Sequence, residues 1–187
     1  MDHFVDIDVR PDPEFPASQL MSALYSKVHR ALVAQGASNI GVSFPGFDLT
    51  PPRLGMRLRL HGNQAALAAL LASDWLMGMR DHVALTPPTR VPVDARHRAV
   101  RRVQVKSNPE RLRRRLMRRH DLDEQEARQR IPDEAVRFAS LPFLQLRSTS
   151  TGQTFRLFIK HGLIQPSAVS GDFNAYGLSQ GATIPWF

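Results

Sequence analysis

The chain has 187 residues, 42% of them hydrophobic, which is enough to bury one large core or the cores of two small domains. No apolar run approaches the length of a membrane span, and the acidic N-terminus lacks the pattern of a signal peptide. The chain has no cysteine, which excludes disulfides and thiolate zinc sites and fits a reducing compartment. These features predict a cytoplasmic protein without a membrane partner.

Positive charge is concentrated in the second half of the chain. The net charge is +8, from 25 Lys and Arg against 17 Asp and Glu. Residues 1–94 hold eight basic and nine acidic residues, a balance of −1, whereas residues 95–187 hold 17 and eight, a balance of +9. Because a codon bias toward arginine would act on both halves, this asymmetry indicates a surface that binds a polyanion.

Strand and helix patterns follow one another regularly in the first half. A helix is predicted over Ala17–Gln35, ended by Gly36, and a second helix after Asn63, whose side chain suits an N-cap. The order βαββαβ predicts a ferredoxin-like domain over residues 1–94. Its strands are predicted where apolar residues recur, around Val5–Val9, Ile40–Phe44, Leu54–Leu60 and His82–Leu85.

A proline-rich connector, TPPTRVPVD over residues 86–94, is the predicted boundary to a second domain over residues 95–187. The predicted fold class is α+β, with this C-terminal α+β domain following the ferredoxin-like one. Its expected elements are a basic extended stretch over Arg96–Lys106, an arginine-rich helix, a short helix with a capping box at Asp121 and Glu124 that stops at Pro132, and a hairpin of Phe143–Ser148 and Phe155–Lys160.

The segment Ser107–His120 is predicted to be the arginine-rich helix. Ser107 or Asn108 can cap it, and Pro109 suits its first turn. At about 100° per residue, Leu112 and Leu116 share one face and are expected to anchor the helix to a core. The other side and the flanks carry six arginines within nine residues, Arg111, Arg113, Arg114, Arg115, Arg118 and Arg119.

The repulsion between these arginines has little local compensation. Glu110 is the only acid within the segment Ser107–His120, so the helix lacks a set of i, i+4 carboxylate partners. This favours binding to a nucleic-acid backbone over an ordinary solvated basic face. Arginine suits phosphates and guanine edges in both DNA and RNA, so composition leaves these two open.

Several long strings resemble one known family. They are RRVQVKSNPERLRRRLMRRHDL, RSTSTGQTFRLFIKHG, YGLSQG with the final PWF, DHFVDIDVRPDPEFP and KVHRALVAQG. Over essentially its full length, and least between about Phe47 and Arg98, the chain resembles the type I-F CRISPR repeat-processing endoribonucleases. The resemblance implies an enzyme that needs no metal or cofactor and cleaves repeat stem-loops at the 3′ base of the hairpin. It also implies retention of the crRNA product and assembly with other subunits of the type I-F surveillance complex.

The resemblance implies a catalytic site of His29, Ser148 and Tyr176. His29 matches the histidine that accepts the proton of the attacking 2′-hydroxyl. Ser148 matches the serine that holds the ribose, and Tyr176 the tyrosine that orients the histidine. Histidine suits this step because it can be neutral near physiological pH. His29 is also predicted at the edge of the apolar stripe of its helix, where it can face outward.

The resemblance further implies a set of RNA contacts. Arg102 and Gln104 would read base edges near the bottom of the stem, as Arg–guanine and Gln–adenine pairs. Phe155 would stack on the terminal base pair, although its alternation with Leu157 and Ile159 equally suits a core face. The side chains implied to enter the major groove are Arg114, Arg115, Arg118 and Arg119, with Arg115 nearest the cleavage end. The remaining implied contacts are Lys106, Ser107, Arg111, His120 and Ser150.

Two other functions use the same sequence features. A non-catalytic structured-RNA-binding protein or RNA chaperone would also need the basic half. A metal-dependent nuclease would need clustered carboxylates. Asp6 and Asp8 are the one pair to consider, but their alternation predicts both on the exposed face of a strand, and no metal site is expected there.

Overall fold

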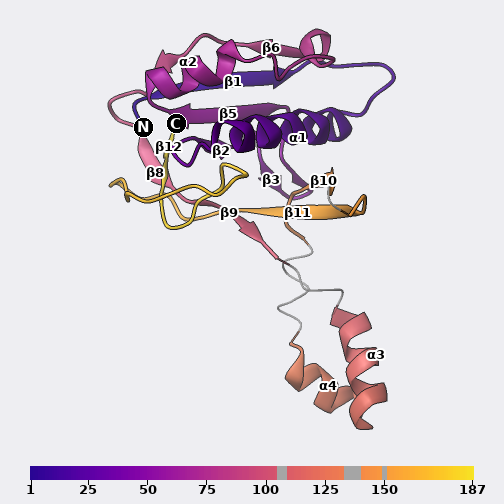
Figure 1. The fold of residues 1–187 in the computed structure, drawn as a ribbon. Helices are drawn as coiled ribbons and strands as arrows, with labels where there is room; N and C mark the ends of the chain where they lie inside the picture. Colours follow the sequence, from indigo (N-terminus) through magenta and orange to yellow (C-terminus); the bar gives the residue numbers. More distant parts are fainter. Residues whose placement is uncertain (105–108, 133–139, 149–150) are drawn as a thin grey trace.

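The computed structural model describes residues 1–104, 109–132, 140–148 and 151–187, without the side chains of residues 109–111. Its described part is a mixed α+β fold with four α-helices and several antiparallel sheets (Figure 1). None of the described helices has the length and apolar character needed to cross a membrane. The elements are β1 (His3–Val9), α1 (Ala17–Gln35), β2 (Gly41–Ser43), β3 (Asp48–Leu49), β4 (Pro52–Arg53), β5 (Arg57–Gly62), α2 (Gln64–Ala72), the 3₁₀ turn η1 (Arg80–His82), β6 (Val83–Leu85), β7 (Thr89–Arg90), β8 (Arg96–Arg98), β9 (Val100–Val103), α3 (Pro109–His120), α4 (Glu124–Arg130), β10 (Phe143–Arg147), β11 (Thr154–His161) and β12 (Ile184–Trp186).

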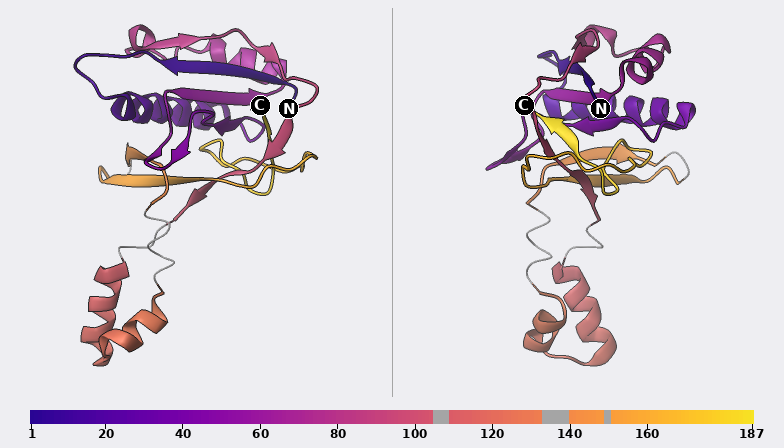
Figure 2. Two further views of the ribbon diagram at one scale, coloured as in Figure 1. Left: turned by 180° about the vertical axis from the view of Figure 1, so that it is seen from behind. Right: turned by 90° about the vertical axis from the view of Figure 1, so that its left-hand side faces the viewer.

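The largest sheet has the strand order β2-β5-β1-β6, with antiparallel neighbours throughout, and β7 adds to β1. Both α1 and α2 contact β1, and they lie on the same side of this sheet (Figure 2). The predicted end of α1 at Gly36 and the predicted N-cap of α2 at Asn63 are confirmed. Gly36 adopts the left-handed conformation, with φ 59°, and the Asn63 side chain accepts a hydrogen bond from the Ala66 amide.

The prediction that Asp6 lies on an exposed face is wrong. Asp6 and Arg59 are opposite each other in the β1–β5 pair, and both are buried. Nε and Nη2 of Arg59 donate to the two carboxylate oxygens of Asp6, at 2.6 and 2.9 Å. The Arg59 guanidinium also lies against the rings of Phe4 and Phe187, 4.6 and 4.0 Å from their centres, and these two rings meet edge to face. The alternation of β1 correctly places Asp6 on the face opposite Val5 and Ile7. This face is buried because Phe187 covers it, and Phe187 is too distant in sequence for the alternation to reveal.

The predicted hairpin is confirmed as β10 and β11, and β9 completes an antiparallel sheet of order β10-β11-β9. The predicted capping box is displaced by two residues. Asp123, not Asp121, is the N-cap of α4, and its partner is Glu126. Asp121 has φ 51°, the left-handed region, whereas an N-cap residue needs extended backbone, which Asp123 has.

One hydrophobic cluster contains buried residues from both halves of the chain, among them Val42, Leu144, Leu157 and Ile184. Backbone and side-chain hydrogen bonds join the halves as well. The Gln145 amide donates to Ser22 Oγ, which ties β10 to α1, and the Val42 amide donates to the Gly177 carbonyl. Residues from the second half of the chain therefore lie against α1 and β2.

The helix α3 begins at Pro109, as predicted, and packs against α4 (Figure 1). The expectation that Leu112 and Leu116 anchor it to a core is met only in part, because both are half-buried and the packing partner is the short helix α4. Arg113, which was predicted on a flank of this helix, does not face solvent. It is buried and donates from Nε and Nη2 to the Ile131 carbonyl at the end of α4.

His161, at the end of β11, is stacked on Phe47 at 3.8 Å between ring centroids and contacts the edge of Trp186. Both of its ring nitrogens are buried and have no hydrogen-bond partner in the described part of the chain. Burial, together with the charge of nearby Arg98, lowers the pKa of His161 to about 3. The ring is therefore neutral in the folded protein at neutral and mildly acidic pH.

This burial predicts a loss of stability in mild acid. Unfolded histidine has a pKa of about 6.5, so between about pH 6.5 and 3 the unfolded chain binds a proton that the folded chain does not. The free energy of unfolding should therefore fall as pH falls through this window, by about 2 kcal/mol from this residue at pH 5. Denaturant unfolding of wild type and His161→Phe at pH 7 and pH 5 measures the difference. An equally steep pH dependence in the variant would contradict the assignment.

Candidate active site and nucleic-acid interface

The centre of the site is His29, half-buried on α1. Its Nδ1 is 2.7 Å from the carbonyl oxygen of Ala175, and its ring is stacked on Tyr176 at 3.9 Å with 7° between the planes. A carbonyl oxygen only accepts hydrogen bonds, so Nδ1 carries the hydrogen in this contact. In the neutral ring, Nε2 is then the atom with the free lone pair, and it can accept a proton.

Tyr176 has two aromatic neighbours on α1. One is His29, and the other is Tyr25, whose ring is nearly parallel to that of Tyr176 at 6.5 Å. The Tyr25 hydroxyl donates to the backbone carbonyl of Tyr176 at 2.7 Å. Burial raises the pKa of Tyr25 well above its usual value, so this hydroxyl remains a neutral donor.

Arg102 and Phe155 join this group from the second sheet. Arg102 lies in β9 and Phe155 in the adjacent β11. The Arg102 guanidinium carbon is 5.6 Å from the ring centre of Tyr176 and 5.9 Å from that of Phe155. Phe155 packs against the core but stays half-buried, unlike the fully buried Leu157 and Ile159. Part of its ring thus remains available to a ligand.

Ser148 follows β10 directly and is half-buried at the turn end of the hairpin. Its amide donates to the Gln153 carbonyl, and its Oγ accepts from the Thr151 amide at 3.2 Å. The other strand of this hairpin carries Phe155, two residues beyond Gln153.

Gln104, the second residue predicted to read base edges, follows β9 and is exposed. His29, Tyr176, Arg102 and Phe155 are thus linked by contacts, and Ser148 lies on the same hairpin as Phe155.

The four arginines of α3 that were predicted to enter the major groove are exposed, Arg114, Arg115, Arg118 and Arg119, and His120 is exposed as well. Arg115, Arg118 and Arg119 form no ion pair within the part of the chain that the structure describes. These side chains keep their charge available for an anionic ligand. Lys106, Ser107, Ser150 and the side chain of Arg111 lie outside the described residues.

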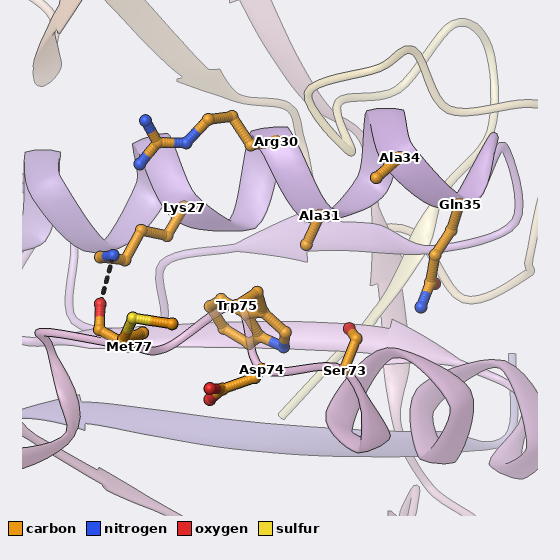
Figure 3. A pocket seen from close by; sticks show the side chains of 9 residues that line it. All are labelled: Lys27, Arg30, Ala31, Ala34, Gln35, Ser73, Asp74, Trp75 and Met77. Carbon is orange, nitrogen blue, oxygen red and sulfur yellow. Dashed lines mark hydrogen bonds between the residues drawn. The ribbon is translucent and has the colours of Figure 1, made fainter.

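A pocket of about 470 Å³ lies against another face of α1, lined by Lys27, Arg30 and the loop around Trp75 (Figure 3). Lys27 Nζ donates to the Met77 carbonyl at its edge. At about 100° per residue, His29 points roughly 160° away from Lys27 around the helix. The pocket is therefore not part of the site around His29.

Sequence patterns did not single out Tyr25, Asn174 or Ala175 as site residues. Tyr25 belongs to the apolar stripe of α1, where an aromatic residue ordinarily indicates core packing. Ala175 contributes only a backbone carbonyl, which has no signature in the sequence. Gly177 indicates a turn, but the sequence does not tell which element this turn packs on.

Comparison with known proteins places the chain in a family. Residues 4–187 match the family described as CRISPR-associated protein (Cas_Csy4). The chain is 60% identical to the CRISPR-associated endonuclease Cas6/Csy4 of Pseudomonas aeruginosa (strain UCBPP-PA14), over 187 residues and 100% of both chains. It is 49% identical to the protein of the same name from Escherichia coli (strain UTI89 / UPEC), also over 100% of both chains. The chain therefore belongs to the CRISPR-associated Cas_Csy4 family.

Proposed function

We propose that this chain, a CRISPR-associated endonuclease that processes pre-crRNA, cuts each repeat stem-loop at the 3′ base of the hairpin. The observation that carries the proposal is the hydrogen bond from His29 Nδ1 to the Ala175 carbonyl, which leaves Nε2 as the acceptor. The surrounding Arg102, Phe155 and exposed α3 arginines supply cationic and aromatic contacts of the kinds that RNA requires.

In the proposed reaction, Nε2 of His29 takes the proton of the 2′-hydroxyl on the 5′ side of the scissile phosphate. The 2′-oxygen attacks phosphorus, and the bond to the 5′-oxygen of the next nucleotide breaks. The leaving 5′-oxygen takes a proton from water, and protonated His29 returns its proton to solvent, so the products are a 2′,3′-cyclic phosphate and a 5′-hydroxyl. Ser148 holds the ribose, and the stacked ring of Tyr176 orients His29. No step requires a metal ion or cofactor.

Substrate binding is proposed to use three groups of side chains. Arg102 and Gln104 read base edges near the bottom of the stem, and Phe155 stacks on the terminal base pair. The exposed arginines of α3 contact phosphates in the major groove, with Arg115 nearest the cut. The remaining proposed contacts are Lys106, Ser107, Arg111, His120 and Ser150. Because these contacts do not involve the cut bond, the enzyme keeps the crRNA hairpin after cleavage.

The proposed organisation extends to domains and partners. We assign residues 1–94 to a ferredoxin-like domain, supported by the strand order β2-β5-β1-β6, and residues 95–187 to an α+β RNA-binding domain. The hairpin-bound enzyme is proposed to join the other subunits of the type I-F surveillance complex. Its substrate is a transcript, so we place the reaction in the cytoplasm.

Cleavage should persist in EDTA. Purified protein mixed with an end-labelled repeat hairpin should give one cut whose 5′ fragment ends in a cyclic phosphate, at the same rate with EDTA as with Mg²⁺. A hairpin with a single 2′-deoxy nucleotide at the cut should bind and remain intact, because its nucleophile is missing. Binding without cleavage of the unmodified RNA would favour an RNA chaperone. Cleavage that EDTA abolishes would favour a metal-dependent nuclease.

A further inference from the structure

The carbonyl that accepts from His29 belongs to a tight loop after Phe173. The Asn174 side chain organises this loop, because its Oδ1 accepts from the amides of Tyr176 and Leu178, at 2.9 and 3.1 Å. Its backbone closes the loop as well. The Asn174 amide donates to the Leu178 carbonyl, and the Gly177 amide donates to the Asn174 carbonyl.

One peptide unit connects Asn174 to His29. The Ala175 carbonyl and the Tyr176 amide belong to the same planar group and point in opposite directions. The amide donates to Asn174 Oδ1, and the carbonyl faces His29 Nδ1 at 2.7 Å. The orientation that Asn174 imposes on the amide therefore sets the direction of the carbonyl. Hydrogen bonds in such a chain also polarise each other, which makes the carbonyl a stronger acceptor.

The loop is also fastened to the body of the protein. The Tyr25 hydroxyl donates to the carbonyl of the next peptide, that of Tyr176, and the Val42 amide donates to the Gly177 carbonyl. Gly177 has φ 68°, and a Cβ at this position would collide with the Val42 side chain. Rotation of the loop away from α1 would break each of these contacts.

We infer that Asn174, assisted by Tyr25, is a positioning residue that holds His29 in the Nδ1–H tautomer with Nε2 ready to accept a proton. This inference rests on the proposed function, in which Nε2 of His29 is the base. Asn174 touches neither the reacting atoms nor, in this assignment, the RNA. Its loss should therefore reduce the cleavage step and leave hairpin binding unchanged.

The test compares Asn174→Ala with Asn174→Asp, which keeps the Oδ1 acceptor, and with exposed Asn39→Ala as a matched control. Under single-turnover conditions at saturating protein, Asn174→Ala should cleave about tenfold more slowly, the effect of losing the hydrogen bond that orients the Tyr176 amide. Its Kd for the 2′-deoxy hairpin should stay within about twofold of wild type. Asn174→Asp should recover most of the rate, and Asn39→Ala should match wild type.

The tautomer itself gives a second readout. In ¹⁵N spectra of the histidine rings at neutral pH, wild-type His29 should show a protonated Nδ1, and Asn174→Ala should shift the ring toward the Nε2–H form. Tyr25→Phe, which removes one hydroxyl and keeps the ring, should move both readouts in the same direction. A normal rate and an unchanged His29 tautomer in Asn174→Ala would overturn the inference. Failure of wild type to cleave would instead overturn the proposed function.

Discussion

His29→Ala should nearly abolish cleavage of the repeat hairpin while leaving its affinity for the hairpin within about twofold. Loss of a positioned general base lowers rates by about 10²–10⁴-fold, and no other side chain in the described site offers a free imidazole nitrogen near Tyr176. Affinity should survive because the proposed binding groups lie on other elements, α3 and the β9–β11 pair.

The measurement is the single-turnover cleavage rate, with binding followed separately on the uncleavable 2′-deoxy hairpin. His82→Ala is a suitable control, because His82 is paired with Asp12 and lies outside the proposed site. Its rate should equal that of wild type. If His29→Ala instead weakens hairpin binding strongly, His29 is a contact or packing residue, and the base must be sought elsewhere.

Replacing Arg115 and Arg118 together by alanine should flatten the salt dependence of hairpin binding. Each phosphate contact that is lost removes roughly one unit from the slope of log K against log salt concentration. Two lost contacts should therefore reduce the slope by about two and weaken binding most at low salt. The structural basis is that both side chains are exposed and form no ion pair within the described ranges, so their charge is free to meet phosphate.

The matched control removes the same charge from the neighbouring helix. Arg128 and Arg130 lie in α4, and Arg128 already pairs with Glu124 at 2.8 Å. Arg128→Ala combined with Arg130→Ala should change the slope much less, because neither residue is among the proposed RNA contacts and Arg128 would first have to leave Glu124. An equal change in both double variants would mean that only net charge matters. An unchanged slope in the first would mean that Arg115 and Arg118 do not contact phosphate.

These two experiments separate catalysis from binding, and the elements they address differ in how far the sequence predicts them. The α3 arginines were predictable because helical periodicity and the lack of nearby acids are local properties. Arg113 was the exception. Its burial depends on the Ile131 carbonyl, which α4 presents only once the two helices pack together.

The active site likewise combines residues that the sequence indicated with residues that only the tertiary structure revealed. Resemblance named His29, Ser148 and Tyr176, and the structure places two of these in direct contact, the rings of His29 and Tyr176. Neither pattern nor resemblance indicated the Ala175 carbonyl or the Asn174 side chain behind it. Their role arises from a contact between residues almost 150 positions apart, and a backbone acceptor leaves no mark on the sequence.

The sequence by itself determined the local elements: the bounds of α1 with its Gly36 terminus, the Asn63 cap, the hairpin and the basic second half. Periodicity and capping act within a few residues, so they can be read along the chain. Only the tertiary structure decided that Asp6 is buried against Arg59, and that the end of the chain returns to α1 to hold His29. Those outcomes depend on which distant segments cover each face, and that is set by packing of the whole core.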